Sequence, residues 1–104
     1  MIKELTSATF DDAIKENEYV IIDCYGDFCF ACELLEPVYD SLAGKMPGIS
    51  FCRINLTQNF DIAEKMQLFD MPTVLYYHNG ELKVKSIGSI DEDTFKNFID
   101  ELIY

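Results

Sequence analysis

Basic residues are scarce in this chain: eight lysines and arginines stand against nineteen aspartates and glutamates, which gives a formal net charge of −11 at pH 7. So acidic a surface repels the phosphates of nucleic acids and of anionic lipid headgroups, unless basic residues gather in a local patch. The basic residues are scattered along the sequence, and only Lys83 and Lys85 stand close together. We therefore expect neither nucleic-acid binding nor membrane binding.

Long apolar runs and secretory features are also lacking. No stretch approaches the roughly 18 apolar residues of a membrane-spanning helix. The sequence begins Met1-Ile2-Lys3-Glu4-Leu5, without the basic start and apolar stretch of a secretory signal, so a cytoplasmic location is expected. No linker rich in proline, glycine and serine divides the 104 residues, so we expect a single domain over residues 1–104.

What the chain does contain is a regular alternation of strand-like and helix-like segments. Residues 19–25 form an almost continuous apolar run rich in β-branched side chains, which is typical of a strand buried on both faces of a sheet. Thr9 and Asp12 have the spacing of a helix capping box, and Asn79-Gly80 predicts a two-residue hairpin turn. In all, strands are predicted at 1–5, 19–25, 49–55, 73–78 and 82–87, and helices at 9–17, 30–46, 59–67 and from 91 onward.

This order, β-α-β-α-β-α-β-β-α, predicts the fold class. It is an α/β fold with a mixed five-stranded central sheet and helices on both faces. Pro37 lies inside the second predicted helix, where we expect a kink. Lys83 and Lys85 alternate along the last strand, which suits a protected edge of the sheet.

Two of the four cysteines, Cys29 and Cys32, form a Cys-x-x-Cys motif between the predicted strand 19–25 and the helix that follows. The first turn of a helix carries unpaired N–H groups and a partial positive charge, which favour a thiolate at Cys29. Two intervening residues also let the two sulfurs meet in a closed disulfide. A Cys-x-x-Cys motif placed in this way in an alternating α/β pattern indicates thiol–disulfide chemistry.

The segment from Val20 to Cys32, VIIDCYGDFCFAC, resembles the active-site segment of the thioredoxin family. Met71-Pro72-Thr73 is similar to the cis-proline loop of that family. Asn79-Gly80, Gly88 and Pro37 stand where the family has its hairpin turn, a late glycine and a kinked helix. The resemblance covers essentially the whole chain and implies the thioredoxin fold.

The resemblance implies a protein disulfide reductase in which Cys29 attacks the substrate disulfide and Cys32 resolves the mixed disulfide. Pro72 would follow a cis peptide bond, and the backbone of Met71 would pair with the substrate chain. The only redox group expected is the Cys29–Cys32 disulfide, with no separate cofactor and no metal. The substrate-binding surface that we expect comprises Phe28, Phe30, Ala31, Met71, Pro72 and Gly88.

The resemblance also implies partners. We expect protein disulfide substrates and an upstream thioredoxin reductase or a similar electron donor. The protein is expected to act as a monomer, in electron transport and cell redox homeostasis.

Asp23 lies inside the apolar strand 19–25, so its carboxyl group is expected to be buried. Burial disfavours the carboxylate and raises its pKa, which suits a group that carries a proton near neutral pH. By the resemblance, Asp23 takes the proton of the resolving thiol, and Arg53 aligns with a basic residue that pairs with this acid. The alternative is an acid at a strand end that reaches water or a cap.

The sequence departs from the family around the motif. Phe30-Ala31 replaces the common Gly-Pro, and we expect the Ala31 N–H, which a proline lacks, to donate to the Cys29 sulfur. Such a donor, and the earlier helix start that Ala31 permits, would stabilise the thiolate. Glu33 would act the other way, but we expect the donor to outweigh it and to make the protein more oxidising than a Gly-Pro member. Four further positions differ: Tyr25 and Phe28 replace tryptophans, Glu33 replaces a lysine and Asp70 replaces a glycine.

Alternatives to disulfide reduction remain open at this point. Cys24, Cys29 and Cys32 have the spacing of a plant-type iron–sulfur electron carrier, with Cys52 as a fourth ligand, and the same four residues could hold zinc. A thioredoxin-fold binding module without catalysis is the other alternative. Against a metal site, Cys24 and Cys52 lie inside predicted strands, where a free cysteine packs as a small apolar side chain.

Overall fold

The computed structural model describes residues 1–104 and contains five strands and four helices. The strands are β1 (Lys3–Leu5), β2 (Tyr19–Tyr25), β3 (Ser50–Asn55), β4 (Thr73–His78) and β5 (Glu81–Ile87). The helices are α1 (Phe10–Glu16), α2 (Phe30–Lys45), α3 (Phe60–Met66) and α4 (Glu92–Ile103). The predicted order of elements is confirmed, and their bounds lie within about two residues of the predicted ones. None of the helices combines the length and the apolar character that crossing a bilayer requires.

The five strands form one mixed sheet in the order β1-β3-β2-β4-β5. β1, β3 and β2 are parallel, whereas β4 runs antiparallel to β2, and β5 runs antiparallel to β4. Asn79 and Gly80 connect β4 to β5 with φ angles of 51° and 80°, as the predicted hairpin turn requires. β2 is the central strand, which explains why its sequence is almost wholly apolar.

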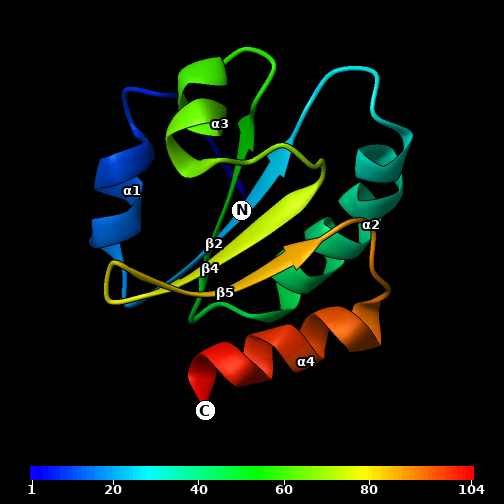
Figure 1. The fold of residues 1–104 in the computed structure, drawn as a ribbon. Helices are drawn as coiled ribbons and strands as arrows, with labels where there is room; N and C mark the ends of the chain where they lie inside the picture. Colours follow the sequence, from blue (N-terminus) through cyan, green and yellow to red (C-terminus); the bar gives the residue numbers. More distant parts are fainter.

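Helices cover both faces of the sheet, α1 and α3 on one side and α2 and α4 on the other (Figure 1). Successive side chains of a strand point to opposite faces, so β2 contributes to both cores. Ile22 and Cys24 belong to the core beneath α1 and α3, whereas Ile21 belongs to the core beneath α2 and α4. Asp23, which alternates with Ile22 and Cys24, therefore points to the side of α2.

The first helix begins differently from the prediction. Thr9 occupies the N-cap position of α1, but its side chain makes no capping hydrogen bond. Its Oγ1 instead accepts a hydrogen bond from the Thr6 N–H at 2.9 Å. The predicted capping box is therefore wrong, because the hydroxyl group serves the turn that precedes the helix.

The carboxyl end of β2 is where the fold assembles the predicted site. Residues 26–29 leave this end of β2 and lead into the N-terminus of α2. Thr73, the first residue of β4, pairs with Cys24 near the same end of β2. The segment after β2 and the loop before β4 therefore meet at the carboxyl end of β2, although they are far apart in the sequence.

Candidate active site

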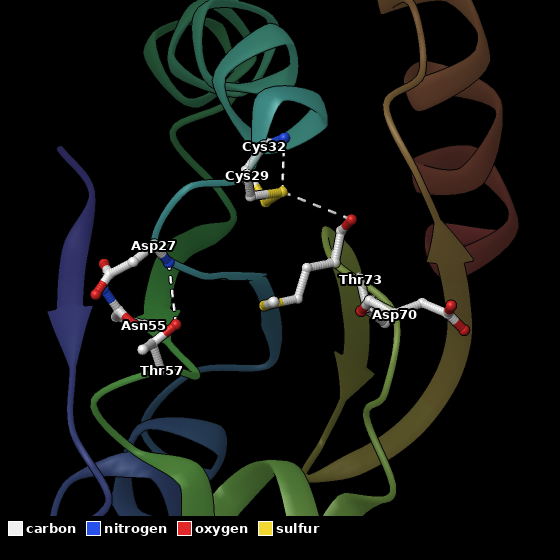
Figure 2. The surroundings of a disulfide bond; sticks show 8 residues. Asp27, Cys29, Cys32, Asn55, Thr57, Asp70 and Thr73 are labelled. Atoms are coloured by element: carbon white, nitrogen blue, oxygen red, sulfur yellow. Dashed lines mark hydrogen bonds between the residues drawn. A yellow bond between two sulfur atoms is a disulfide. The ribbon is translucent and has the colours of Figure 1, made fainter.

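Cys29 and Cys32 form a disulfide at the N-terminus of α2 (Figure 2). Cys29 is the N-cap residue of this helix, and its Sγ accepts a hydrogen bond from the Cys32 N–H at 3.2 Å. Cys29 is half-buried, whereas only 7% of Cys32 is exposed, so Cys29 is the more accessible of the two cysteines. The partial positive charge of the helix N-terminus also lies at Cys29, where it stabilises a thiolate.

The loop before β4 lies directly against Cys29. The Met71–Pro72 peptide bond is cis. The Met71 carbonyl oxygen is 3.7 Å from Cys29 Sγ, and a dashed line from Cys29 marks this contact in Figure 2. In the disulfide, Cys29 Sγ carries no hydrogen, so the two atoms are only in contact. In the reduced protein, the Cys29 thiol could donate a hydrogen bond to the Met71 carbonyl oxygen. Gly88, with a φ of 89°, donates its N–H to the Pro72 carbonyl oxygen at 2.8 Å. The predicted residues Met71, Pro72 and Gly88 are thus linked to one another, with Met71 in contact with Cys29.

Asp23 is buried, as predicted: only 3% of the residue is exposed, and its Oδ1 has no hydrogen-bond partner. It lines a cavity of about 300 Å³ together with Cys29 and Cys32. Burial raises the pKa of Asp23 to about 7, the guanidinium of Arg53 opposes this rise, and nearby carboxylates add to it. A carboxyl group that titrates near neutral pH can both accept and release a proton there.

Arg53 lies beside Asp23 in the sheet but pairs with another acid. The two residues are register partners on the adjacent strands β2 and β3. Arg53 nevertheless donates from Nη2 to Oδ1 of Asp40, on α2, at 2.9 Å. The ion pair between Asp23 and Arg53 that the resemblance implied is therefore wrong, because Asp40 holds the guanidinium.

The sequence of this chain is similar to the sequences of known proteins. Residues 1–101 match the family model described as Thioredoxin. The chain belongs to the thioredoxin family. It is similar to the thioredoxin of Chlamydia pneumoniae, with 27% identity over 101 residues that cover 97% of this chain and 98% of the relative. It is also similar to thioredoxin-1 of Saccharomyces cerevisiae, with 29% identity over 84 residues that cover 81% of this chain and 82% of the relative.

Solved structures of thioredoxins share the fold. The oxidised mitochondrial thioredoxin 3 of Saccharomyces cerevisiae aligns with a TM-score of 0.87 and 29% identity, over 95% of this chain and 94% of that one. Plasmodium falciparum thioredoxin aligns with a TM-score of 0.88 and 27% identity, over 95% and 97% of the two chains. As a family member with a Cys29–Cys32 disulfide, the protein is a thiol–disulfide oxidoreductase. The iron–sulfur carrier and the non-catalytic binding module are not favoured.

The four cysteines of this thioredoxin-family chain lie in two separate places. Cys24 and Cys52 are free thiols buried in the core beneath α1 and α3. Cys29 and Cys32 lie beyond the carboxyl end of β2, at the start of α2. The four sulfurs do not converge on a common point, so the sequence spacing that suggested a metal site does not correspond to one in space. The predicted burial of Cys24 and Cys52 is confirmed.

Phe30 and Ala31 lie between the two cysteines, and in the disulfide form neither donates a hydrogen bond to Cys29 Sγ. Ala31 makes no hydrogen bond to Cys29 Sγ, and the N–H that reaches this sulfur is that of Cys32. A helix N-cap side chain accepts from the second or third residue after it, and here the third residue, Cys32, supplies the donor. Because this is the disulfide form, donation from Ala31 to a Cys29 thiolate stays a prediction, and so does the more oxidising potential. Phe30 is 73% exposed and Phe28 is fully exposed with a φ of 54°.

An apolar groove adjoins the disulfide and was not predicted. It has a volume of about 360 Å³ and shares Met71 with the loop that contacts Cys29. Phe60 and Phe69 expose 60% and 74% of their surface, so two aromatic rings that contribute little to the core are available here. In the sequence, the only indication that Phe60 and Phe69 are exposed is that both stand outside the predicted strands and outside the apolar faces of the predicted helices. The full lining is Leu56, Thr57, Phe60, Ala63, Leu68, Phe69 and Met71.

Gly26 makes room for the Met71 side chain. A Cβ atom at position 26 would overlap the Sδ and Cε atoms of Met71 and would lie 3.0 Å from Oγ1 of Thr57. Thr57 in turn accepts a hydrogen bond from the Asp27 N–H at 3.0 Å (Figure 2). The turn after β2 and the groove are therefore packed against each other, and a side chain at position 26 would displace the flexible end of the Met71 side chain.

Proposed function

We propose that Cys29 is the attacking thiol and Cys32 the resolving thiol of a protein disulfide reductase. The observation that carries this assignment is the contrast between a half-buried Cys29 at the helix N-terminus and a buried Cys32 behind it. In the first step, the Cys29 thiolate attacks one sulfur of a substrate disulfide. A Cys29–substrate disulfide forms, and the other substrate sulfur leaves with the bonding pair and takes a proton from solvent.

In the second step, the Cys32 thiol loses its proton to the Asp23 carboxylate, and the resulting thiolate attacks Cys29 Sγ. The bond between Cys29 and the substrate breaks, and the substrate sulfur leaves with the bonding pair. The Cys29–Cys32 disulfide remains, so the substrate has gained the two electrons that the protein has lost. Support for Asp23 as the proton acceptor comes from its unpartnered Oδ1, its place in the cavity that Cys32 also lines, and a pKa raised to about 7.

After each turnover, the Cys29–Cys32 disulfide needs two electrons from a donor. We assign this step to a thioredoxin reductase or a similar donor, as membership of the family suggests. The exchange itself needs no further cofactor, because each step replaces one sulfur–sulfur bond by another. We infer that the chain works in this cycle as a single-domain monomer in the cytoplasm.

The surfaces on either side of the disulfide favour substrates that carry an apolar and a basic residue near the target disulfide. On one side, Phe60, Phe69 and Met71 line the apolar groove, and burial of a large apolar side chain contributes about 1.5–3 kcal/mol. On the other side, four carboxylates line the cavity around Asp23, and complementary charge favours association with a cationic segment. These acids are Glu4, Asp27, Glu33 and Glu36.

Replacing both Phe60 and Phe69 with serine should lower kcat/KM about tenfold for a peptide disulfide that carries phenylalanine beside its cysteine. The reason is that burial of one aromatic side chain, worth about 1.5 kcal/mol, is lost. For the same peptide with serine in place of phenylalanine, the change should be small. The measurement is kcat/KM for both peptides with the parent protein and with the double variant.

The matched control is Leu82→Ser, which removes an exposed apolar residue of β5 near the hairpin, at the end of the sheet away from Thr73. It should leave both values unchanged. If the parent protein shows no preference between the two peptides, the groove takes no part in substrate recognition. The roles of Cys29 and Cys32 would stand in that case.

A further inference from the structure

Asp23 and Arg53 are positioned to form an ion pair that the structure does not contain. They are register partners on the parallel strands β2 and β3, which places their side chains on the same face of the sheet. The Arg53 guanidinium instead lies 2.9 Å from Oδ1 of Asp40 and 5.9 Å from the ring centre of Tyr39, both on α2. Asp23 is left buried, with Oδ1 unpartnered.

The choice of partner decides what Asp23 can do. An adjacent guanidinium that donated hydrogen bonds to Asp23 would favour its carboxylate, and an opposite charge at close range typically lowers a carboxyl pKa by about 1–3 units. A carboxylate stabilised in that way is a weaker acceptor for the proton of a thiol. The partner of Arg53 therefore sets the proton affinity of Asp23.

We propose that Asp40 is a positioning residue for the resolving step: it holds the Arg53 guanidinium away from Asp23 and so keeps Asp23 able to take the proton of Cys32. The proposal rests on the role of Asp23 in the proposed function. Asp40 is half-exposed and touches neither sulfur, so it acts through Arg53. Its carboxylate is the only one that forms an ion pair with this arginine.

The other groups around Asp23 do not oppose this arrangement. Three carboxylates disfavour a negative charge on Asp23, and Arg53 is the one cation that favours it. Asp40 therefore acts twice, since it is one of these carboxylates and also the partner of the cation. Loss of its charge should make Asp23 a stronger acid on both counts. The neighbouring titratable groups are Glu4 on β1, Cys24 and Tyr25 on β2, Asp27 and Cys29 in the segment after β2, Arg53 on β3, Cys32, Glu33, Glu36, Tyr39 and Asp40 on α2, and Tyr76 on β4.

The test follows the Asp23 carboxyl carbon by NMR across pH in the oxidised protein, in which Cys29 and Cys32 do not titrate. Asp40→Asn should move the Asp23 midpoint down by at least about one pH unit. Arg53→Met, which removes the guanidinium, should move it up. The matched control is Asp11→Asn, which makes the same change in net charge by breaking an exposed ion pair with Lys65 on the opposite side of the sheet. This variant should leave the midpoint where it is.

A second readout connects the titration to the reaction. The rate at which Cys32 releases a peptide from a preformed Cys29 mixed disulfide should show the same shift in its pH profile in Asp40→Asn. If Asp40→Asn titrates like Asp11→Asn, the assignment to Asp40 is overturned and the proposed function stands. If the titration moves but the release profile does not, Asp23 is not the proton acceptor, and both the assignment and that part of the proposed function fail.

Discussion

Replacement of Cys32 with serine is expected to trap substrates on Cys29 as mixed disulfides, whereas replacement of Cys29 with serine is expected to trap none. Without the Cys32 thiol, the second exchange has no attacking group, so the Cys29–substrate bond persists. Without Cys29, the remaining thiol is buried, with only 7% of Cys32 exposed, and a substrate disulfide cannot reach it. Both variants should lose turnover to the background level. The measurement is the amount of covalent complex on non-reducing gels after incubation with a protein disulfide.

Two observations complete that experiment. The trapped complexes should disappear on addition of dithiothreitol, and a Cys29→Ser/Cys32→Ser double variant should form none, because Cys24 and Cys52 are buried in the core. Equal trapping by the two single variants would reverse the conclusion, since it would mean that either sulfur can attack the substrate.

Replacement of Asp23 with asparagine is expected to stabilise the protein at alkaline pH and to slow its reaction. Folding raises the pKa of Asp23 from 3.8 to about 7, so the folded protein binds a proton that the unfolded chain has lost between these values. The stability that this proton confers is complete below about pH 3.8, falls as the pH rises, and is lost above about pH 7. Its full size is about 4 kcal/mol.

Asparagine resembles the protonated carboxyl group and has no proton to lose. The variant should therefore match the parent protein near pH 4 and exceed it by up to about 4 kcal/mol at pH 8. Urea unfolding at both pH values measures this difference. Asp100→Asn, an exposed change on α4, is the control and should show no such dependence on pH.

The kinetic part of the same prediction concerns the proton of Cys32. Release of substrate from the mixed disulfide should slow at least about tenfold near pH 7 in Asp23→Asn, because the proton acceptor is missing. A variant that is more stable at pH 8 but reacts at the parental rate across neutral pH would show that Asp23 has a structural role only.

The fold and the reactive pair could be predicted because their signals are local. The β-branched run 19–25 indicates a central strand, and the same run shows that the single acid within it, Asp23, is buried. The Cys-x-x-Cys motif between a strand and a helix places Cys29 at the N-cap of α2. Each of these conclusions depends on neighbours within a few residues, where sequence and structure correspond closely.

Features that depend on contacts between distant segments could not be predicted. Arg53 and Asp40 are 13 residues apart on different elements, and only the packing of α2 on the sheet brings the two side chains together. The groove joins Phe60, at the start of α3, and Phe69, in a loop, to Met71 of the predicted cis-proline loop, and no local motif marks the two phenylalanines. The donor to Cys29 Sγ is of another kind, since both candidates were local and the geometry of the helix cap selects Cys32 in the disulfide form.

The central claim, that this protein reduces protein disulfides through Cys29 and Cys32, is tested most directly by the reduction of insulin with dithiothreitol as the electron source. The rate is read from the turbidity of the insulin chains that precipitate once their disulfides are reduced. We predict that the parent protein accelerates precipitation over dithiothreitol alone and that neither Cys29→Ser nor Cys32→Ser does so. A parent protein no faster than dithiothreitol alone, or a Cys29→Ser variant as fast as the parent, would contradict the account.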